Sequence, residues 1–286
     1  MIGRGAILVI ARLTLREAFR RRLLWALVAL TLVLVVATGW LFGKAAELSP
    51  IDGAAQQLLL SQLLVMIAFM FSFVLTMTAA FAASPAIGPE IENGLLLAVL
   101  ARPVRRSDVL LGRWLGLAAV VVGYALAAGY LELGAVKLLT GYLPVDPMVA
   151  PFYLAGESLV LLTLALVFST RIAPVASGSI AVVGFGLAWM GGIAGGIGDY
   201  LNNDPLRIAG TIVHLILPSD TLWRGAMFAL EPPPDVLAAA GSQARIFTVS
   251  PFFAGTPPPL PWLAWCAAWA VATLAIGVLM LRRREL

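Results

Sequence analysis

Charged residues are scarce in this chain. Of its 286 residues only 12% are charged and 61% are hydrophobic, and the mean hydropathy is +0.96. Soluble domains carry about 25% charged residues, so this supply is too small to cover a globular surface. The composition excludes an ordinary soluble domain and indicates a protein that lies in a lipid bilayer.

Cysteine and histidine are equally rare, because the sequence holds one of each, Cys266 and His214. A single cysteine cannot form a disulfide within the chain, so the redox compartment is not revealed. We interpret Cys266 as a small apolar packing residue. A zinc site needs about three or four suitable ligands, and the sequence has no Cys/His cluster, so we expect no metal site.

Catalytic motifs are also missing from the sequence. It contains no G-x-x-x-x-G-K-[ST] loop, so the chain does not bind ATP through a P-loop of its own. Ser177 and Ser179 suggest an intramembrane hydrolase, but the single histidine lies in a segment that we place outside, beyond the reach a nucleophile needs. Glu90 and Glu92 share one loop and define no substrate cleft. We therefore expect no enzyme activity and no cofactor in this chain.

What the sequence has in abundance is long apolar stretches. About 20 apolar residues cross a bilayer as a helix, and six stretches reach this length. The first is longer than the apolar region of a signal peptide, so we interpret it as a true span. The predicted fold is an all-α membrane protein of one domain, residues 1–286, with spans near 23–43, 58–83, 109–131, 152–170, 174–197 and 262–281.

The basic residues give these spans a direction. Lysine and arginine collect in cytoplasmic segments of membrane proteins. With both termini inside, cytoplasmic segments hold 14 of the 19 basic residues and the outer segments hold the other five: Lys44, Lys137, Arg207, Arg224 and Arg245. We therefore predict a multi-pass protein of the inner (plasma) membrane with both termini cytoplasmic. This topology accounts for the net charge of +4 without nucleic acid, which we do not expect as a partner.

Residues 4–21 precede the first span and have the pattern of an amphipathic helix. One stripe of this helix is basic and another is apolar: Arg12, Arg16 and Arg20, and Leu8, Leu15 and Phe19. Such a pattern is typical of a helix lying in the membrane interface, in contact with lipid. The alternative is a cluster of charges that only orients the first span.

Glycine is dense in the fifth span, where eight glycines fall between Gly178 and Gly198. Small residues let helix backbones approach closely in lipid. We expect this span to pack tightly on a neighbour or to kink; the alternative is a flexible wall of a transport pathway.

The longest external segment is predicted at 198–261. Its apolar part is broken at "LPSD", so we expect two short helices that meet there, with Ser219 or Asp220 capping the second. Non-helical backbone at membrane depth must be shielded by protein. Eight prolines follow in 231–261, which we interpret as an irregular loop.

Three ionisable residues lie near the outer ends of spans: Glu132, Lys137 and Glu157. Charge within a membrane is costly and often marks a functional position. The three residues are candidates for a polar cluster that lines an exit pathway. Alternatively, they are interfacial charges that face water.

The cytoplasmic loop 84–108 is unusually polar for this chain. We expect a short helix from about Pro89 to Leu100, with Glu90 and Glu92 in its first turn, where carboxylates are favourable. The helix breaks before Pro103. Ser107 or Asp108 is predicted to cap the third span. The leucines of the short helix must pack on the bundle, on lipid or on a partner.

These features together resemble the permease subunits of type 2 ABC exporters. The resemblance rests on the order of acidic residues, glycine and leucines before "RPVRR", "SD" and "LLGRW", and on "ARLTLREAFRRRLLW", "LVFSTRIAPVASG" and "LPSDTLWRGA". It extends over nearly the whole chain, through loose motifs. The sequence departs from the family at Arg113, where lysine is common, and at Asn93–Gly94–Leu95, where Gly-Thr is common.

The resemblance implies a transport subunit that is driven by others. A separate ABC ATPase subunit would bind ATP and Mg²⁺, and a second permease chain, identical or homologous, would complete the translocation pathway. The residues that the resemblance assigns to coupling with the ATPase are Glu90, Glu92, Gly94, Arg102, Pro103, Arg105 and Arg106. The alternative is a secondary transporter or channel without an ATPase, which would show matching broken helices in its two halves; the sequence shows no such repeat.

Overall fold

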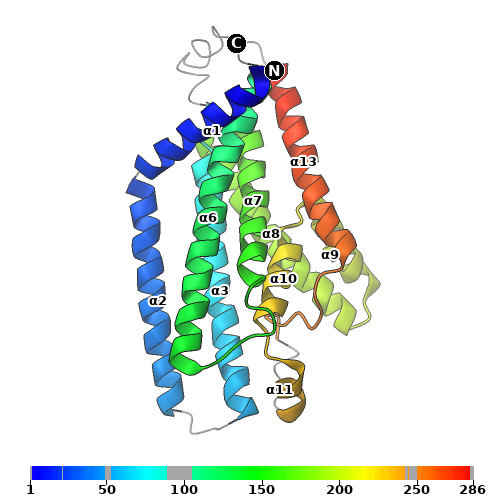
Figure 1. Cartoon of the computed structure of the whole chain (residues 1–286). Coiled ribbons are helices and arrows are strands. Elements are labelled where there is room, and N and C mark those ends of the chain that lie inside the picture. The colour runs from blue at the N-terminus through cyan, green and yellow to red at the C-terminus, as the bar shows by residue number, and fades with distance from the viewer. Residues whose placement is uncertain are drawn as a thin grey trace.

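The computed structural model describes residues 2–20, 22–48, 53–88, 105–241, 244 and 250–283. Every regular element in these ranges is an α-helix, which confirms the all-α prediction. Six long helices correspond to the six predicted spans: α2 (Arg22–Leu48), α3 (Ala54–Ala83), α6 (Arg106–Thr140), α7 (Ala150–Phe168), α8 (Pro174–Tyr200) and α13 (Leu260–Arg282). The N-terminal helix begins and α13 ends at one end of the bundle, here called the terminal end, and α11 (Pro234–Ala239) lies at the other, the distal end (Figure 1).

The number of membrane spans supported by the structure is five to six. All the long helices except α2 are long and apolar enough to cross a bilayer, and α2 offers the shorter apolar stretch Thr31–Lys44. Except for α7, which begins and ends two residues earlier than its predicted span, the helices extend beyond the predicted spans, most clearly α6, which has 35 residues. Its last turn carries Lys137, and Gly141 ends it in the left-handed region at φ 71°, where glycine is favoured.

The start of α6 differs from the prediction. Neither Ser107 nor Asp108 is the N-cap; the cap is Arg105, which makes no side-chain capping bond. Ser107 and Asp108 are instead buried in the first turn, where the Ser107 hydroxyl donates to Asp108 Oδ1 at 3.3 Å. The carboxylate still lies at the positive end of the helix dipole, so it stabilises the helix without capping it.

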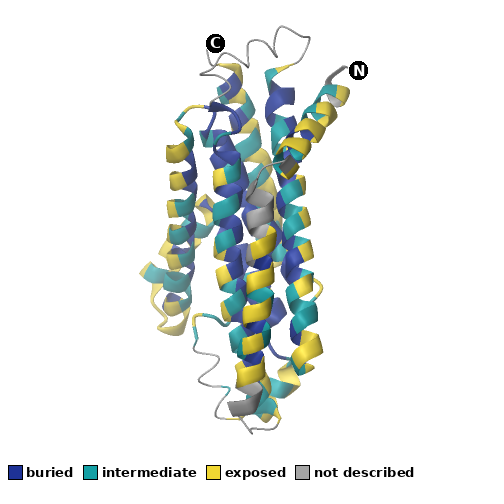
Figure 2. Ribbon diagram, turned by 90° about the vertical axis from the view of Figure 1, so that its left-hand side faces the viewer, coloured by how far each residue is buried: buried dark blue, intermediate teal, exposed yellow. Residues whose placement is uncertain are grey.

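The centre of the bundle is α7, which packs against α3, α6, α8, α10 and α13. Buried residues line the inside of the bundle, whereas exposed ones follow the outer faces of the helices (Figure 2). Many of these exposed residues are large and apolar, such as Val183, Leu187 and Met190 on α8. Lipid tails are as apolar as these side chains, so their exposure to lipid costs little.

The N-terminal helix α1 (Ile2–Arg20) packs against the terminal half of α6 through two glycines (Figure 1). A Cβ on Gly112 would lie 2.7 Å from the Ile10 Cβ, and one on Gly116 would lie 2.7 Å from the Ala11 carbonyl oxygen. This four-residue spacing of glycines permits close contact of two helix backbones. A helix forms where the sequence predicted one; its place in the membrane interface stays a prediction.

The exposed faces of α1 have the predicted character. Leu8 and Phe19 are exposed, as are Arg12 and Arg16. The buried face is a third one, formed by small residues such as Ala11, which the search for basic and apolar stripes did not single out.

The segment predicted to be external forms three short helices, α9 (Asp204–Ile216), α10 (Ser219–Leu230) and α11, in its described part. The break predicted at "LPSD" lies between α9 and α10, at Leu217 and Pro218. The predicted caps are wrong, because Pro218 is the N-cap of α10 and neither Ser219 nor Asp220 caps it. Part of the stretch predicted to be irregular is helical, since α11 begins directly after Pro233, and proline is well suited to a helix start.

The glycines at the α1–α6 contact give a test of this packing. We expect Gly116→Leu to lower the free energy of unfolding by about 1–3 kcal/mol, because the added atoms force α1 away from α6. Gly123→Leu is the matched control on the same helix, since nothing lies within 4 Å of a Cβ there. The measurement is thermal unfolding of both variants in detergent, and equal midpoints would contradict the packing.

Candidate coupling and pathway sites

Most of the predicted coupling residues lie outside the described residues: Glu90, Glu92, Gly94, Arg102 and Pro103. The remaining two, Arg105 and Arg106, form the start of α6. Arg105 is exposed, and Arg106 Nη1 donates to the Leu281 carbonyl oxygen of α13 at 3.2 Å. The coupling segment itself therefore stays a prediction, but the chain that follows it enters the bundle in contact with α13.

A second arginine binds the same end of α13. Arg171, in the turn between α7 and α8, donates through Nη2 to the Met280 carbonyl oxygen at 2.9 Å. The last carbonyls of a helix lack partners within it and carry partial negative charge. Arg106 and Arg171 supply donors to them, so the C-terminal end of α13 is bound both to the start of α6 and to the α7–α8 turn.

The predicted polar cluster is divided among different environments. Lys137 is exposed, whereas Glu132 is partly buried, and its buried Oε1 has no hydrogen-bond partner. Glu132 also borders a cavity of about 40 Å³ between α2, α3, α6 and α7. Within the described ranges, no ion pair or hydrogen bond joins Glu132, Lys137 and Glu157. Their common role in a pathway stays a prediction.

Glu157 is the most deeply buried of these three residues, at 1% exposure. Ser72 of α3 donates to its Oε2 at 2.6 Å, but its Oε1 is buried and has no hydrogen-bond partner. Asp220 of α10 is close enough to act on Glu157 electrostatically. Ionisable groups in such positions are expensive to bury and commonly functional.

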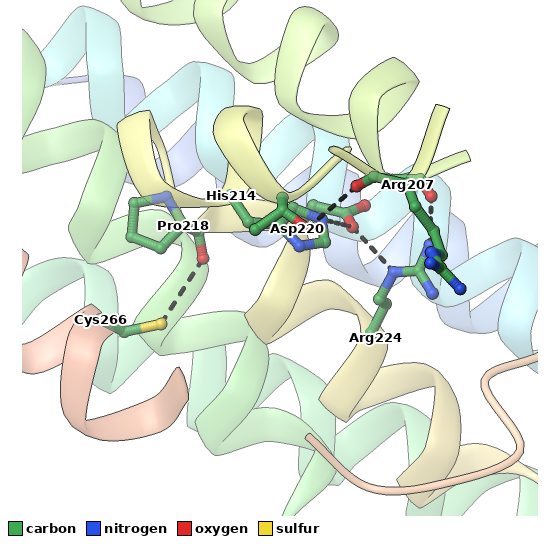
Figure 3. Close-up of polar contacts among 8 residues, drawn as sticks. Arg207, His214, Pro218, Asp220, Arg224 and Cys266 are labelled. Carbon is green, nitrogen blue, oxygen red and sulfur yellow. Dashed lines mark hydrogen bonds and ion pairs between the residues drawn. The ribbon is translucent and has the colours of Figure 1, made fainter. Parts of the chain in front are cut away.

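Asp220 is the centre of a polar network that joins three helices. Its Oδ2 accepts hydrogen bonds from His214 Nε2 of α9 at 2.8 Å and from Arg224 Nε at 2.9 Å, and Arg224 Nη2 donates to the Gly192 carbonyl oxygen of α8 (Figure 3). Asp220 is 4% exposed. The buried carboxylate is thus paired with one permanent cation and holds α8, α9 and α10 together.

The glycines of α8 make this network possible. A Cβ on Gly192 would lie 2.0 Å from Asp220 Oδ2, and one on Gly191 would lie 2.6 Å from a methyl carbon of Val213 on α9. A Cβ on Gly198 would lie 2.6 Å from the Arg207 backbone nitrogen. The tight packing predicted for this glycine-rich span is therefore present, and the neighbour is α9.

The break between α9 and α10, here called the elbow (residues 216–219), is bound to α13. Trp269 Nε1 donates to the Ile216 carbonyl oxygen at 2.8 Å, and Cys266 Sγ lies 3.7 Å from the Pro218 carbonyl oxygen (Figure 3). Ile216 is the last residue of α9, so its carbonyl oxygen has no partner within that helix and needs one elsewhere in the protein. Cys266 is buried as expected, but it also serves as a weak donor.

Sequence reasoning missed the network around Asp220. It considered Asp220 only as a cap, His214 only as a possible base, and Arg224 only as an outer charge. One signal was available, since Asp220 and Arg224 are four residues apart and therefore share a helical face. The partners on α8 and α9 have no comparable signal, because they depend on how the helices pack.

Glu231 fixes the loop that returns to α13. It is 2% exposed, and its Oε1 accepts hydrogen bonds from the backbone nitrogens of Ala254 at 2.5 Å and Gly255 at 3.3 Å. Its own carbonyl oxygen accepts from the Val145 nitrogen at 2.9 Å. Burial raises the pKa of the Glu231 carboxyl group to about 7, although the two backbone donors oppose this.

An intramembrane hydrolase would need a serine nucleophile beside a base, and the described residues show no such pair for Ser177 and His214. Ser177 is fully buried and donates to the Ala165 carbonyl oxygen at 3.2 Å, inside the bundle. The single histidine, His214, is bound to Asp220 instead. Nucleophile and base would have to lie within hydrogen-bond reach of each other.

The fold and these contacts define a multi-pass helical membrane protein. The sequence model of the ABC-2 family transporter proteins matches residues 8–254, which is most of the chain. The chain therefore belongs to the ABC-2 transporter family and is a permease subunit. It matches no curated protein.

Asp220 can be tested against a second acidic residue of the same segment. We expect Asp220→Asn to lower the free energy of unfolding by about 1.5–3 kcal/mol, because the buried carboxylate that accepts charge-assisted hydrogen bonds from Arg224 and His214 is lost. Asp204→Asn removes a largely exposed pair with Arg207 and is expected to cost at most about 1 kcal/mol. Chemical denaturation in detergent measures both, and similar losses would show that the Asp220 network does not hold the helices.

Glu231 predicts a pH dependence of stability. Its pKa is raised from 4.5 to about 7 on folding, so between these values the folded state holds a proton that the unfolded state has lost. The contribution of Glu231 to stability is therefore present below about pH 4.5 and is lost as the pH rises toward about 7.

Glu231→Gln isolates this effect, since the amide oxygen can accept the same two backbone hydrogen bonds. We expect the variant to lose less stability than the unaltered chain between pH 5 and pH 7.5. Thermal unfolding at both pH values measures the difference. Parallel curves for the two proteins would rule out Glu231 as the titrating group.

Proposed function

We propose that this permease subunit belongs to an ATP-driven exporter, in which a separate ABC ATPase subunit binds ATP and Mg²⁺. A second permease chain, identical or homologous, would complete the translocation pathway. The single observation that carries the proposal is the family match over residues 8–254. The chain has no P-loop of its own, so the energy must come from a partner.

The contacts at the terminal end support a path for this energy. A push on residues 84–108 reaches α6 directly, because α6 begins at Arg106. It also reaches α13, because Arg106 donates to the Leu281 carbonyl oxygen. Arg171 connects the α7–α8 turn to the same end of α13. Three elements would therefore move together when the ATPase acts.

The other half of α13 extends this path toward the distal end. Cys266 and Trp269 bind the elbow between α9 and α10, and Asp220 in the first turn of α10 binds α9 and, through Arg224, α8. A displacement of α13 would thus be transmitted to the external helices. An ATPase at one end of the bundle needs such a connection in order to drive the release of a substrate at the other end.

The orientation in the membrane follows from charge. Arg105, Arg106 and Arg171 lie at the terminal end, as do Arg282 and Arg283 at the end of α13. Lysine and arginine favour the cytoplasmic side. We place the terminal end in the cytoplasm and the chain in the inner (plasma) membrane, with the ATPase docked beside Arg105.

The docking site can be tested with Arg105. We expect Arg105→Glu to lower the amount of ATPase subunit that co-purifies with the permease by about tenfold or more, because a like-charge contact costs several kcal/mol. Arg283→Glu is the control, since it reverses another exposed arginine at the same end. Quantification of the ATPase on an affinity-tagged permease measures both.

Equal recovery with the two variants would contradict docking at Arg105. Flux of a substrate through the purified chain without any ATPase would overturn the proposed function as a whole and favour a secondary transporter or channel.

A further inference from the structure

A cavity of about 360 Å³ lies between α8, α10 and the loop that precedes α13. Small-molecule sites commonly have volumes of about 300–1,000 Å³, so this one fits a small ligand or one end of a longer ligand. Its apolar wall includes Ile193, Ile197 and Tyr200 of α8 and Phe253 of the loop. Tyr200 is 73% exposed and Ile197 is 46% exposed, so the cavity opens at the molecular surface.

The loop that closes the cavity is held in place by the bundle. Glu231 accepts hydrogen bonds from the Ala254 and Gly255 nitrogens, directly after Phe253. The neighbouring Phe252 packs edge-on against Phe69 of α3, with ring centroids 5.4 Å apart. The wall is therefore anchored from two sides, and the cavity does not depend on a free loop.

Arg224 is the one charged residue among the described residues that line this cavity. Its guanidinium group is oriented by Asp220, which accepts from Nε, and by the Gly192 carbonyl oxygen, which accepts from Nη2. A guanidinium group has five N–H donors, so three remain after these two bonds. The Arg224 side chain is 33% exposed. Among the described residues that line the cavity, no other charged group is present to bind the remaining donors.

We propose that this cavity binds an amphiphile with an anionic head group. A carboxylate or phosphate would accept hydrogen bonds from the remaining donors of Arg224, since these groups match the planar guanidinium fork. The apolar body would lie against Ile193, Ile197, Tyr200 and Phe253. The same chemistry is offered by a free anionic amphiphile and by an anionic phospholipid of the membrane. The site does not depend on the ATPase coupling proposed above.

The free amphiphile is tested with radiolabelled decanoate and with decanol, its neutral counterpart, by equilibrium dialysis of the purified chain in a non-ionic detergent. We expect decanoate to bind at least tenfold more tightly than decanol. Arg224→Gln should abolish this preference, whereas Arg207→Gln, which removes an exposed arginine of α9, should retain it.

Gly196→Leu separates ligand binding from the structural role of Arg224. A Cβ on Gly196 would lie 3.5 Å from Arg224 Nη2, so a leucine there fills the cavity while Arg224 keeps its partners. Gly186→Leu is the control on the same helix, because nothing lies within 4 Å of its Cβ. We expect only Gly196→Leu to weaken decanoate binding at least tenfold.

The phospholipid source is tested in nanodiscs. Phosphatidylglycerol should raise the thermal midpoint above that in phosphatidylcholine, since a ligand that binds the folded state stabilises it, and Gly196→Leu should remove this difference. Stabilisation by phosphatidylglycerol without decanoate binding identifies a lipid head group as the ligand. The site is refuted if decanoate and decanol bind equally and the two lipids give the same midpoint.

Discussion

The structure depends on one constraint, which is that buried backbone away from water must find its hydrogen-bond partners within the protein. The elbow shows how this is met. The carbonyl oxygen of Ile216 has no helical partner where α9 ends, and Trp269 of α13 donates to it. Cys266 of α13 contacts the Pro218 carbonyl oxygen at the start of α10. At its other end α13 has unpaired carbonyls of its own, and two arginines bind them. The same requirement thus ties α13 to both ends of the molecule.

Close approach of helices replaces the hydrophobic effect as the source of packing in lipid. Gly112 and Gly116 let α1 rest on α6, and Gly191 and Gly192 let α9 and α10 approach α8. These contacts matter for function because they bring polar groups together. With a side chain at position 192, Asp220 would have no room beside α8.

The buried carboxylates are satisfied in different ways. Asp220 has a cationic partner, and Glu231 has two backbone donors. Glu157 has a single donor from Ser72 and one oxygen without a partner. Burying a carboxylate in this way costs free energy that packing must offset. Glu157 is thus the least satisfied of the three carboxylates, and Glu132 likewise has a buried oxygen without a partner.

The sequence by itself determined the class of the protein, the long helices, the N-terminal helix, the break at Leu217 and Pro218, and the family. The class, the helices and the break depend on composition, on a local period or on a proline, and the family depends on the resemblance of the quoted motifs. Only the tertiary structure decided that Ser72 meets Glu157, that Trp269 meets Ile216, and that Asp220 joins three helices. In lipid, residues facing a neighbouring helix and residues facing the bilayer are equally apolar. Hydropathy therefore marks a helix as a span but does not show which of its faces meets which partner.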